Sequence, residues 1–156
     1  MTTNALRKLK TLGMEVETRE YAVDEHDLSA VAVASKLGID QDMVFKTLVV
    51  VGDRTGPFMC VIPGSAELDL KKTARASGDK SVAMLPMREL EPLTGYVRGG
   101  CSPIGARRKL PVFLDETAQL WDRVSVSAGT RGLQMLLTPS DLALAAEAAY
   151  ADLVKR

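Results

Sequence analysis

The chain has 156 residues, of which 46% are apolar and 4% aromatic, and its formal net charge is zero. This length fits one domain with an aliphatic core, so we expect residues 1–156 to form a single domain. Zero net charge argues against a protein that grips nucleic acid unaided, and no DNA partner is expected. Two widely separated cysteines and no apolar run of membrane-spanning length predict a reduced, cytoplasmic protein without a membrane partner.

Helical and extended patterns alternate in the first part of the chain. Leu6, Leu9 and Leu12 share one helical face, and a β-branched run follows Phe45. Gly52 and Gly56 bracket a turn between two apolar runs, which is typical of a hairpin. In chain order, the expected elements are a helix over 3–12, a strand over 14–22, a helix over 29–37, and a hairpin of strands over 45–51 and 58–62.

The second part of the chain is richer in short strands. In chain order we expect a helix over 69–77, a strand over 82–85, a helical turn over 87–91, an irregular segment over 95–110, a strand over 112–114, a short helix capped by Asp115, strands over 124–127 and 133–137, and a helix from the Thr138 cap to about Tyr150. Strands outnumber helices without regular βαβ alternation. The sequence therefore predicts a mixed α/β fold, with a mostly antiparallel, barrel-like twisted sheet and helices packed outside.

Several kinds of site are excluded by missing residues. His26 is the only histidine, and it lies in an acidic stretch where we expect a solvated loop. No CxxC or HxxxH spacing exists for a metal, and no G-x-S-x-G elbow supports a serine triad. No phosphate-binding glycine motif for nucleotides is present. The sequence therefore predicts a site with neither a metal nor a cofactor.

Lys46 interrupts the apolar run of the predicted hairpin. A buried ammonium is costly unless it reaches water or a partner. Its side chain would either extend to solvent or point into a cleft to bind an anion or a carbonyl oxygen. A loop with three glycines and a proline, residues 99–105, also allows two interpretations. It is either a structural turn or a source of backbone N–H groups for an oxyanion.

Four short stretches together resemble the YbaK/EbsC family, free-standing relatives of the editing domain of bacterial prolyl-tRNA synthetases. They are Val44-Phe45-Lys46-Thr47-Leu48, Leu68-Asp69-Leu70-Lys71-Lys72, the run from Thr94 to Gly105, and Val126-Ser127-Ala128-Gly129-Thr130-Arg131-Gly132-Leu133. The resemblance covers essentially the whole chain and is nearest to the Cys-tRNA(Pro) deacylase branch. It implies trans-editing: hydrolysis of the ester between a wrong amino acid and tRNA.

The resemblance also implies which residues form the site and which partners it meets. Lys46 is the expected catalytic residue, placed against the aminoacyl-adenosine end. The expected substrate-binding residues are Tyr21, Thr47, Gly100, Ser102, Ser127 and Gly129. The acceptor end of aminoacyl-tRNA is the expected substrate, and prolyl-tRNA synthetase is an expected partner.

The implied mechanism needs no protein nucleophile, because the thiol of the cysteine substrate would attack its own ester while Lys46 and backbone N–H groups position it. Two alternatives remain open. One is an editing deacylase for alanine or another small amino acid; the other is a non-catalytic module that binds a nucleotide or an RNA end. Cys101, within the glycine loop, is either a small buried hydrophobe or a reactive thiol.

Overall fold

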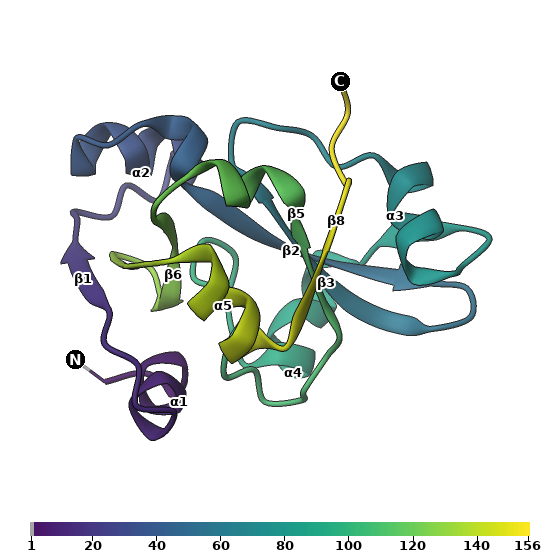
Figure 1. The fold of residues 1–156 in the computed structure, drawn as a ribbon, viewed down its shortest axis with the longest axis horizontal. Coiled ribbons are helices and arrows are strands. Elements are labelled where there is room, and N and C mark those ends of the chain that lie inside the picture. Colours follow the sequence, from purple (N-terminus) through teal and green to yellow (C-terminus); the bar gives the residue numbers. More distant parts are fainter. Residues whose placement is uncertain (1) are drawn as a thin grey trace.

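The computed structural model describes residues 2–156, which form two β-sheets with helices packed around them (Figure 1). One sheet has the strand order β1-β7-β6, and the other has the order β4-β2-β3-β5-β8. The strands are β1 (Glu17–Glu20), β2 (Phe45–Gly52), β3 (Gly56–Pro63), β4 (Val82–Met84), β5 (Val112–Asp115), β6 (Val124–Thr130), β7 (Leu133–Leu137) and β8 (Ala148–Ala151).

The mixed, mostly antiparallel character of the predicted fold is confirmed, but the sheet is not a closed barrel. The first sheet is antiparallel throughout, and β2 runs antiparallel to both β3 and β4. The pairs β3–β5 and β5–β8 are parallel. A bridge between Val44 and Ser125 joins the two sheets. The sheets thus meet at the start of β2 instead of curling into one surface.

Side-chain caps define where most helices begin. The hydroxyls of Thr3, Ser29 and Thr138 and the carboxylate of Asp69 each accept a backbone N–H of the first turn. The helices are α1 (Asn4–Thr11), α2 (Ala30–Leu37), α3 (Leu70–Ser77), α4 (Leu90–Thr94) and α5 (Pro139–Ala146), with 3₁₀ turns at Gln41–Met43, Met87–Glu89 and Glu116–Leu120. In Figure 1 the long β2–β3 hairpin crosses the middle of the molecule, with α2 at one end and α3 at the other.

Strand β2 contributes to two hydrophobic cores. Phe45 and Val49 belong to the larger core, which includes β6 and β7 of the first sheet together with α1 and α5. Val50 and the partly buried Leu48 belong to a second core with Phe58 and the C-terminal segment. Because side chains alternate along a strand, Lys46 lies on the same face of β2 as Leu48 and Val50. No helix within residues 2–156 is long and apolar enough to span a bilayer.

The C-terminal helix is shorter than predicted. It ends at Ala146, and Glu147 adopts a left-handed backbone with φ of 53°. The chain then forms β8, which pairs in parallel with β5. Alanine favours a helix locally, but pairing with β5 and burial of the following Leu153 override that preference. The prediction of a helix to Tyr150 was therefore wrong over its last turn.

Candidate active site

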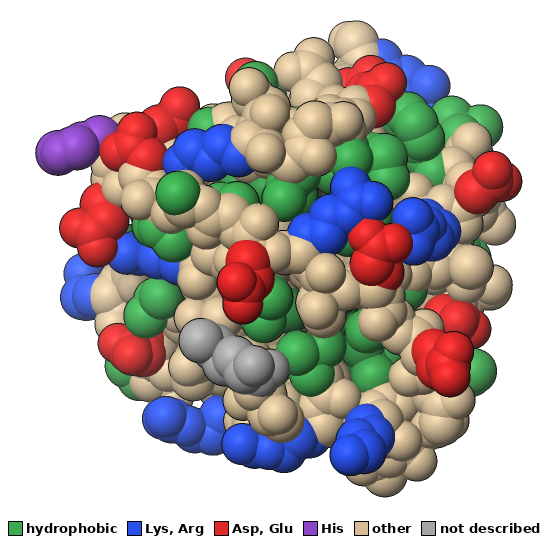
Figure 2. Space-filling model, turned by 90° about the vertical axis from the view of Figure 1, so that its left-hand side faces the viewer, with side chains coloured by type: hydrophobic (Ala, Val, Ile, Leu, Met, Phe, Trp, Pro, Cys, Tyr) green, Lys and Arg blue, Asp and Glu red, His purple; other side chains and the backbone are tan. Residues whose placement is uncertain are grey.

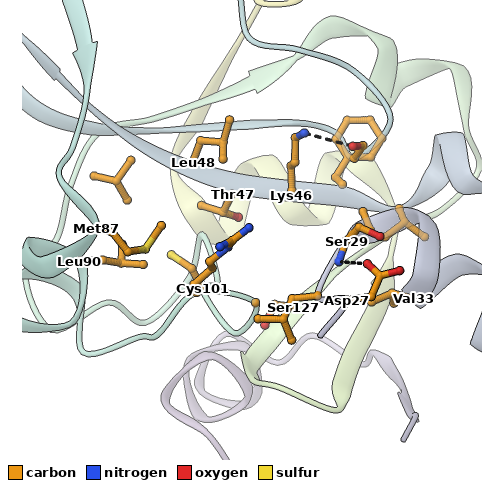
Figure 3. A pocket seen from close by; sticks show the side chains of 18 of the residues that line it. Asp27, Ser29, Val33, Lys46, Thr47, Leu48, Met87, Leu90, Cys101 and Ser127 are labelled. Atoms are coloured by element: carbon orange, nitrogen blue, oxygen red, sulfur yellow. Dashed lines mark hydrogen bonds between the residues drawn. The ribbon is translucent and has the colours of Figure 1, made fainter. Parts of the chain in front are cut away.

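A cavity of about 470 Å³ lies where the two sheets meet, within the size range of small-molecule sites. Its wall draws on both sheets, on the loop before α2, on the segment that leads into α4, and on the glycine loop (Figure 3). The lining residues used below are His26, Asp27, Ser29, Lys46, Thr47, Leu48, Gly64, Met84, Met87, Leu90, Arg98, Cys101, Ser127 and Gln134.

The cavity follows an open edge of β2. Strand β4 pairs only with Val50–Gly52, and the N–H of Leu85 then donates to the carbonyl of Val49. Backbone groups of alternate residues point to the same side of a strand, so the N–H and C=O of Thr47 face this open edge. In Figure 3 the side chains of Lys46 and Thr47 leave β2 in opposite directions. A ligand at this edge therefore meets the side chains of both faces and a backbone donor between them.

Lys46 is half-buried and directs its amine to the carbonyl of Gly64, with Nζ and O 3.1 Å apart. Burial lowers the pKa of the Lys46 ammonium, and the exposed Glu67 carboxylate opposes that shift as the smaller influence. Lys46 forms no ion pair in the described part of the chain. Within residues 2–156 the amine donates only to Gly64, so two of its three donor positions remain for a ligand.

The backbone of Gly64 fixes the position of the carbonyl oxygen that accepts the Lys46 hydrogen bond. Its N–H donates to the carbonyl of Val44 at 2.7 Å, which continues the β2–β3 ladder beyond Pro63. A Cβ added at Gly64 would lie 1.9 Å from the Cβ of Ala30 in α2. Only glycine allows the chain to approach α2 this closely. Gly64 therefore contacts α2 and also accepts the hydrogen bond of Lys46.

The glycine loop is held in place by its neighbours. The hydroxyl of the buried Tyr96 donates to the carbonyl of Ile104 at 2.6 Å. Nε of Arg131 donates to the carbonyl of Arg98 at 2.7 Å, and the N–H of Gly100 donates to the carbonyl of Val97 at 2.9 Å. The loop therefore presents Arg98 and Cys101 to the cavity, while the N–H of Gly100 is used inside the loop.

The structure brings some of the expected site residues to the cavity and places others behind it. Lys46, Thr47 and Ser127 line the cavity, whereas the other four expected residues are not among the lining residues. Tyr21 packs beside α2, with the amine of Lys36 5.9 Å from its ring centre. Gly100 is buried, so it supports the lining residues from the next layer.

Ser102 and Gly129 also lie in that second layer. Ser102 is fully buried, and its Oγ accepts the N–H of Ile104 at 3.3 Å. Gly129 has φ of 107°, and its N–H donates to Oγ of the lining Ser127 at 3.1 Å. Both residues therefore shape the turns that carry lining side chains.

Sequence reasoning missed several lining residues. Asp27 and Arg98 lie in loops without periodicity, and Met87 lies in a 3₁₀ turn. Gln134 is a buried polar residue of β7 whose amide oxygen accepts the hydroxyl of Ser125 at 2.8 Å. Two signals were available: a polar residue inside the run of β7, and the position of Arg98 within the run from Thr94 to Gly105. His26, which was expected to be solvated, is exposed and lies at the cavity rim.

Cys101 is 8% exposed, and burial raises the pKa of its thiol to about 12. At neutral pH such a thiol is protonated and is a poor nucleophile. Cys101 therefore acts as a small apolar part of the cavity wall, beside Met87 and Leu90 in Figure 3.

Comparison with known proteins identifies the family. The family model for the aminoacyl-tRNA editing domain matches residues 24–144. The chain belongs to the aminoacyl-tRNA editing domain family. This confirms the resemblance to the YbaK/EbsC family and the predicted enzyme class, an aminoacyl-tRNA deacylase.

Three similar proteins place this editing domain more closely. It is 46% identical over 154 residues to EbsC of Enterococcus faecalis, whose name makes it a candidate Cys-tRNA(Pro)/Cys-tRNA(Cys) deacylase, and the match covers 99% of this chain and 94% of EbsC. A proline–tRNA ligase of Thermodesulfovibrio yellowstonii is 31% identical over 106 residues, which are 67% of this chain and 18% of the ligase. The crystal structure of a candidate trans-editing enzyme for prolyl-tRNA synthetase has a TM-score of 0.85 at 28% identity, covering 100% of this chain and 99% of that one.

The buried amine of the editing domain should titrate abnormally. Lys46 is expected to lose its proton at a lower pH than an ordinary lysine, because burial penalises the charged form. NMR titration of lysine-labelled protein measures this, with Lys46→Met assigning the signal. A midpoint at or above the ordinary lysine value would contradict the expectation.

The same shift has a consequence for stability. The folded state holds this proton less tightly than the unfolded state, so ionised Lys46 costs stability below its folded pKa. That cost is lost as the pH rises from the folded to the unfolded pKa. Lys46→Met should therefore unfold at no lower urea concentration than wild type at pH 7. A loss of more than about 1 kcal/mol would show that the amine is held by stabilising contacts.

Proposed function

We propose that this editing domain releases cysteine from mischarged Cys-tRNA(Pro). The observation that carries the proposal is that Lys46, which forms no ion pair within residues 2–156, lines a cavity together with Cys101, whose pKa is raised by burial. Such a site can bind and polarise an ester, while its thiol is a poor nucleophile. The similarity to EbsC over nearly the full length of both chains supports cysteine as the amino acid.

The open edge of β2 suits an aminoacyl ester. The Lys46 amine and the backbone N–H of Thr47 are the donors for the ester carbonyl and the charge that develops on it. Ser127, a residue that is 7% exposed, adds a hydroxyl to the lining of the cavity. Met87, Leu90 and Cys101 offer an apolar surface to a small side chain (Figure 3). The cavity thus orients an ester and a short side chain at the same time.

The substrate itself supplies the nucleophile in the proposed reaction. A cysteine thiol of ordinary pKa, about 8.5, is a few per cent thiolate near pH 7. Its sulfur forms a bond with the carbonyl carbon, the bond from that carbon to the ribose oxygen breaks, and the oxygen takes up a proton. Water then opens the resulting four-membered thiolactone to give free cysteine. The protein contributes orientation and charge stabilisation.

Replacing Lys46 tests the central residue. Lys46→Ala should lower kcat/KM for release of cysteine from Cys-tRNA(Pro) at least tenfold, because one charged donor is lost near the ester. Lys71→Ala is the matched control, since Lys71 is an exposed lysine on α3 outside the cavity. Full activity of Lys46→Ala would remove Lys46 from the mechanism.

The substrate's sulfur tests the source of the nucleophile. Ser-tRNA(Pro) is expected to be deacylated at least tenfold more slowly than Cys-tRNA(Pro), because a hydroxyl is far less ionised than a thiol near pH 7. Parallel deacylation assays at one pH measure the two rates. Equal rates would point to direct attack by water and to a broader specificity for small amino acids.

We further propose that prolyl-tRNA synthetase assists the editing domain in holding tRNA. Basic and acidic side chains are interspersed over the face shown in Figure 2, and the net charge is zero, so the chain offers weak electrostatic attraction to RNA. The match to part of a proline–tRNA ligase supports a link to that enzyme. Adding the synthetase to the deacylation assay should raise kcat/KM severalfold, most strongly at raised salt. An unchanged value at every salt concentration would count against assistance.

A further inference from the structure

Asp27 is the one carboxylate among the lining residues of the cavity, within the described part of the chain. It precedes α2 by a few residues and lies beside Ser29. Figure 3 shows this pair on the side of the cavity away from Met87, Leu90 and Cys101. The cavity therefore has an acidic end and an apolar end.

The neighbours of Asp27 favour the ionised form of its carboxylate. The hydroxyl of Ser29, and then its N–H, keep the pKa of Asp27 below its usual range, and the N–H donates to Oδ1 at 3.1 Å. Lys36 adds a weaker attraction, but its amine donates to the carbonyl of Ala22. Within residues 2–156, Asp27 takes part in no ion pair. A carboxylate without an ion-pair partner among the described residues thus lies at the rim of the cavity.

The other ionisable side chains at the rim of the cavity are basic. Lys46 and Arg98 carry positive charge, and His26 completes the set of titratable side chains at the rim. A cationic group of a ligand is repelled by Lys46 and Arg98 and attracted by Asp27. An anionic group, such as a backbone phosphate, has the opposite preference. A ligand that carries both charges can therefore find an attractive lining group for each of them.

The acceptor end of an aminoacyl-tRNA is such a ligand. Its α-ammonium lies one carbon from the ester carbonyl, and its phosphates lie on the other side of the ribose. We propose that Asp27 binds the α-ammonium of the aminoacyl group, so that the site selects esters with a free amine over those whose amine is acylated. This proposal rests on the proposed function. It adds a specificity residue that also distinguishes aminoacyl-tRNA from peptidyl-tRNA.

The experiment pairs variants of two aspartates with two substrates. Asp27→Asn keeps the side-chain oxygen that accepts the Ser29 N–H and removes the charge. Asp24→Asn is the matched control, because Asp24 accepts the N–H of His26 in the same way, at 3.0 Å, but does not line the cavity. The substrates are tRNA(Pro) charged with cysteine and with 3-mercaptopropionate, which has the thiol and ester but no amine and no added bulk.

Release of cysteine by the wild type is measured first. If the wild type releases none, the proposed function fails, and the ammonium site that rests on it fails with it. Asp27→Asn is expected to lower kcat/KM for the cysteine ester about tenfold and to leave the mercaptopropionate ester within about twofold of wild type. Asp24→Asn should change neither.

Three results would overturn the ammonium site. Equal losses on both substrates would show that Asp27 only shapes its loop. No loss on the cysteine ester would show that Asp27 does not meet the substrate. Equal losses with Asp24→Asn and Asp27→Asn would show a general effect of the loop charge. Lys46→Ala, by contrast, should lower activity on both esters, because Lys46 acts on the ester that they share.

Discussion

The pairing register of the β2–β3 hairpin decides where the amine of Lys46 lies. Lys46 pairs with Ile62, so Gly64 comes to lie beside Val44 two residues further along the chain. The carbonyl of Gly64 then accepts the hydrogen bond of the Lys46 amine. A slip of one residue would exchange the two faces of β2 and point this charge into the larger core. The contact of Gly64 with α2 extends the same constraint to the loop that carries Asp27. One hairpin register thus positions Lys46 and constrains the loop that carries Asp27.

The junction of the two sheets explains why the site combines distant parts of the chain. Strand β2 supplies Lys46 and Thr47, while β6 and β7 supply Ser127 and Gln134. The bridge from Val44 to Ser125 and the buried hydrogen bond from Ser125 to Gln134 hold these strands together. A closed barrel would have paired the edge of β2 and removed the opening. The incomplete closure of the sheet is therefore what gives a ligand access to the backbone of Thr47.

Elements fixed by local chemistry were predicted well from the sequence. The caps at Ser29 and Thr138 and the turn between β2 and β3 lie where their residues indicated. Strand β8 was missed because its alanines favour a helix and its partner β5 is far away in the chain. The positive φ of Glu147, which ends α5 without a glycine, left no signal in the sequence.

The site residues, like the secondary structure, were predicted where a local motif marked them and missed where distant parts of the chain come together. Lys46, Thr47 and Ser127 stood in recognisable motifs and do line the cavity. Asp27 lies in an irregular loop outside the motifs, and Arg98 stood in a motif without being assigned to the site. Gly100, Ser102 and Gly129 stood in the same motifs as lining residues, yet they lie one layer behind, because a motif does not distinguish a lining residue from one that supports it.

The protonated state of Cys101 bears on how this protein could be inhibited. Electrophilic warheads, which capture a thiolate or an activated hydroxyl, find a thiol in this cavity whose burial raises its pKa to about 12. An inhibitor that relies on covalent capture of Cys101 would therefore react slowly, whereas a reversible compound could use the charges of Asp27 and Lys46 and the apolar surface beside Met87. Such a compound would also be spared by the cellular thiols that consume reactive drugs.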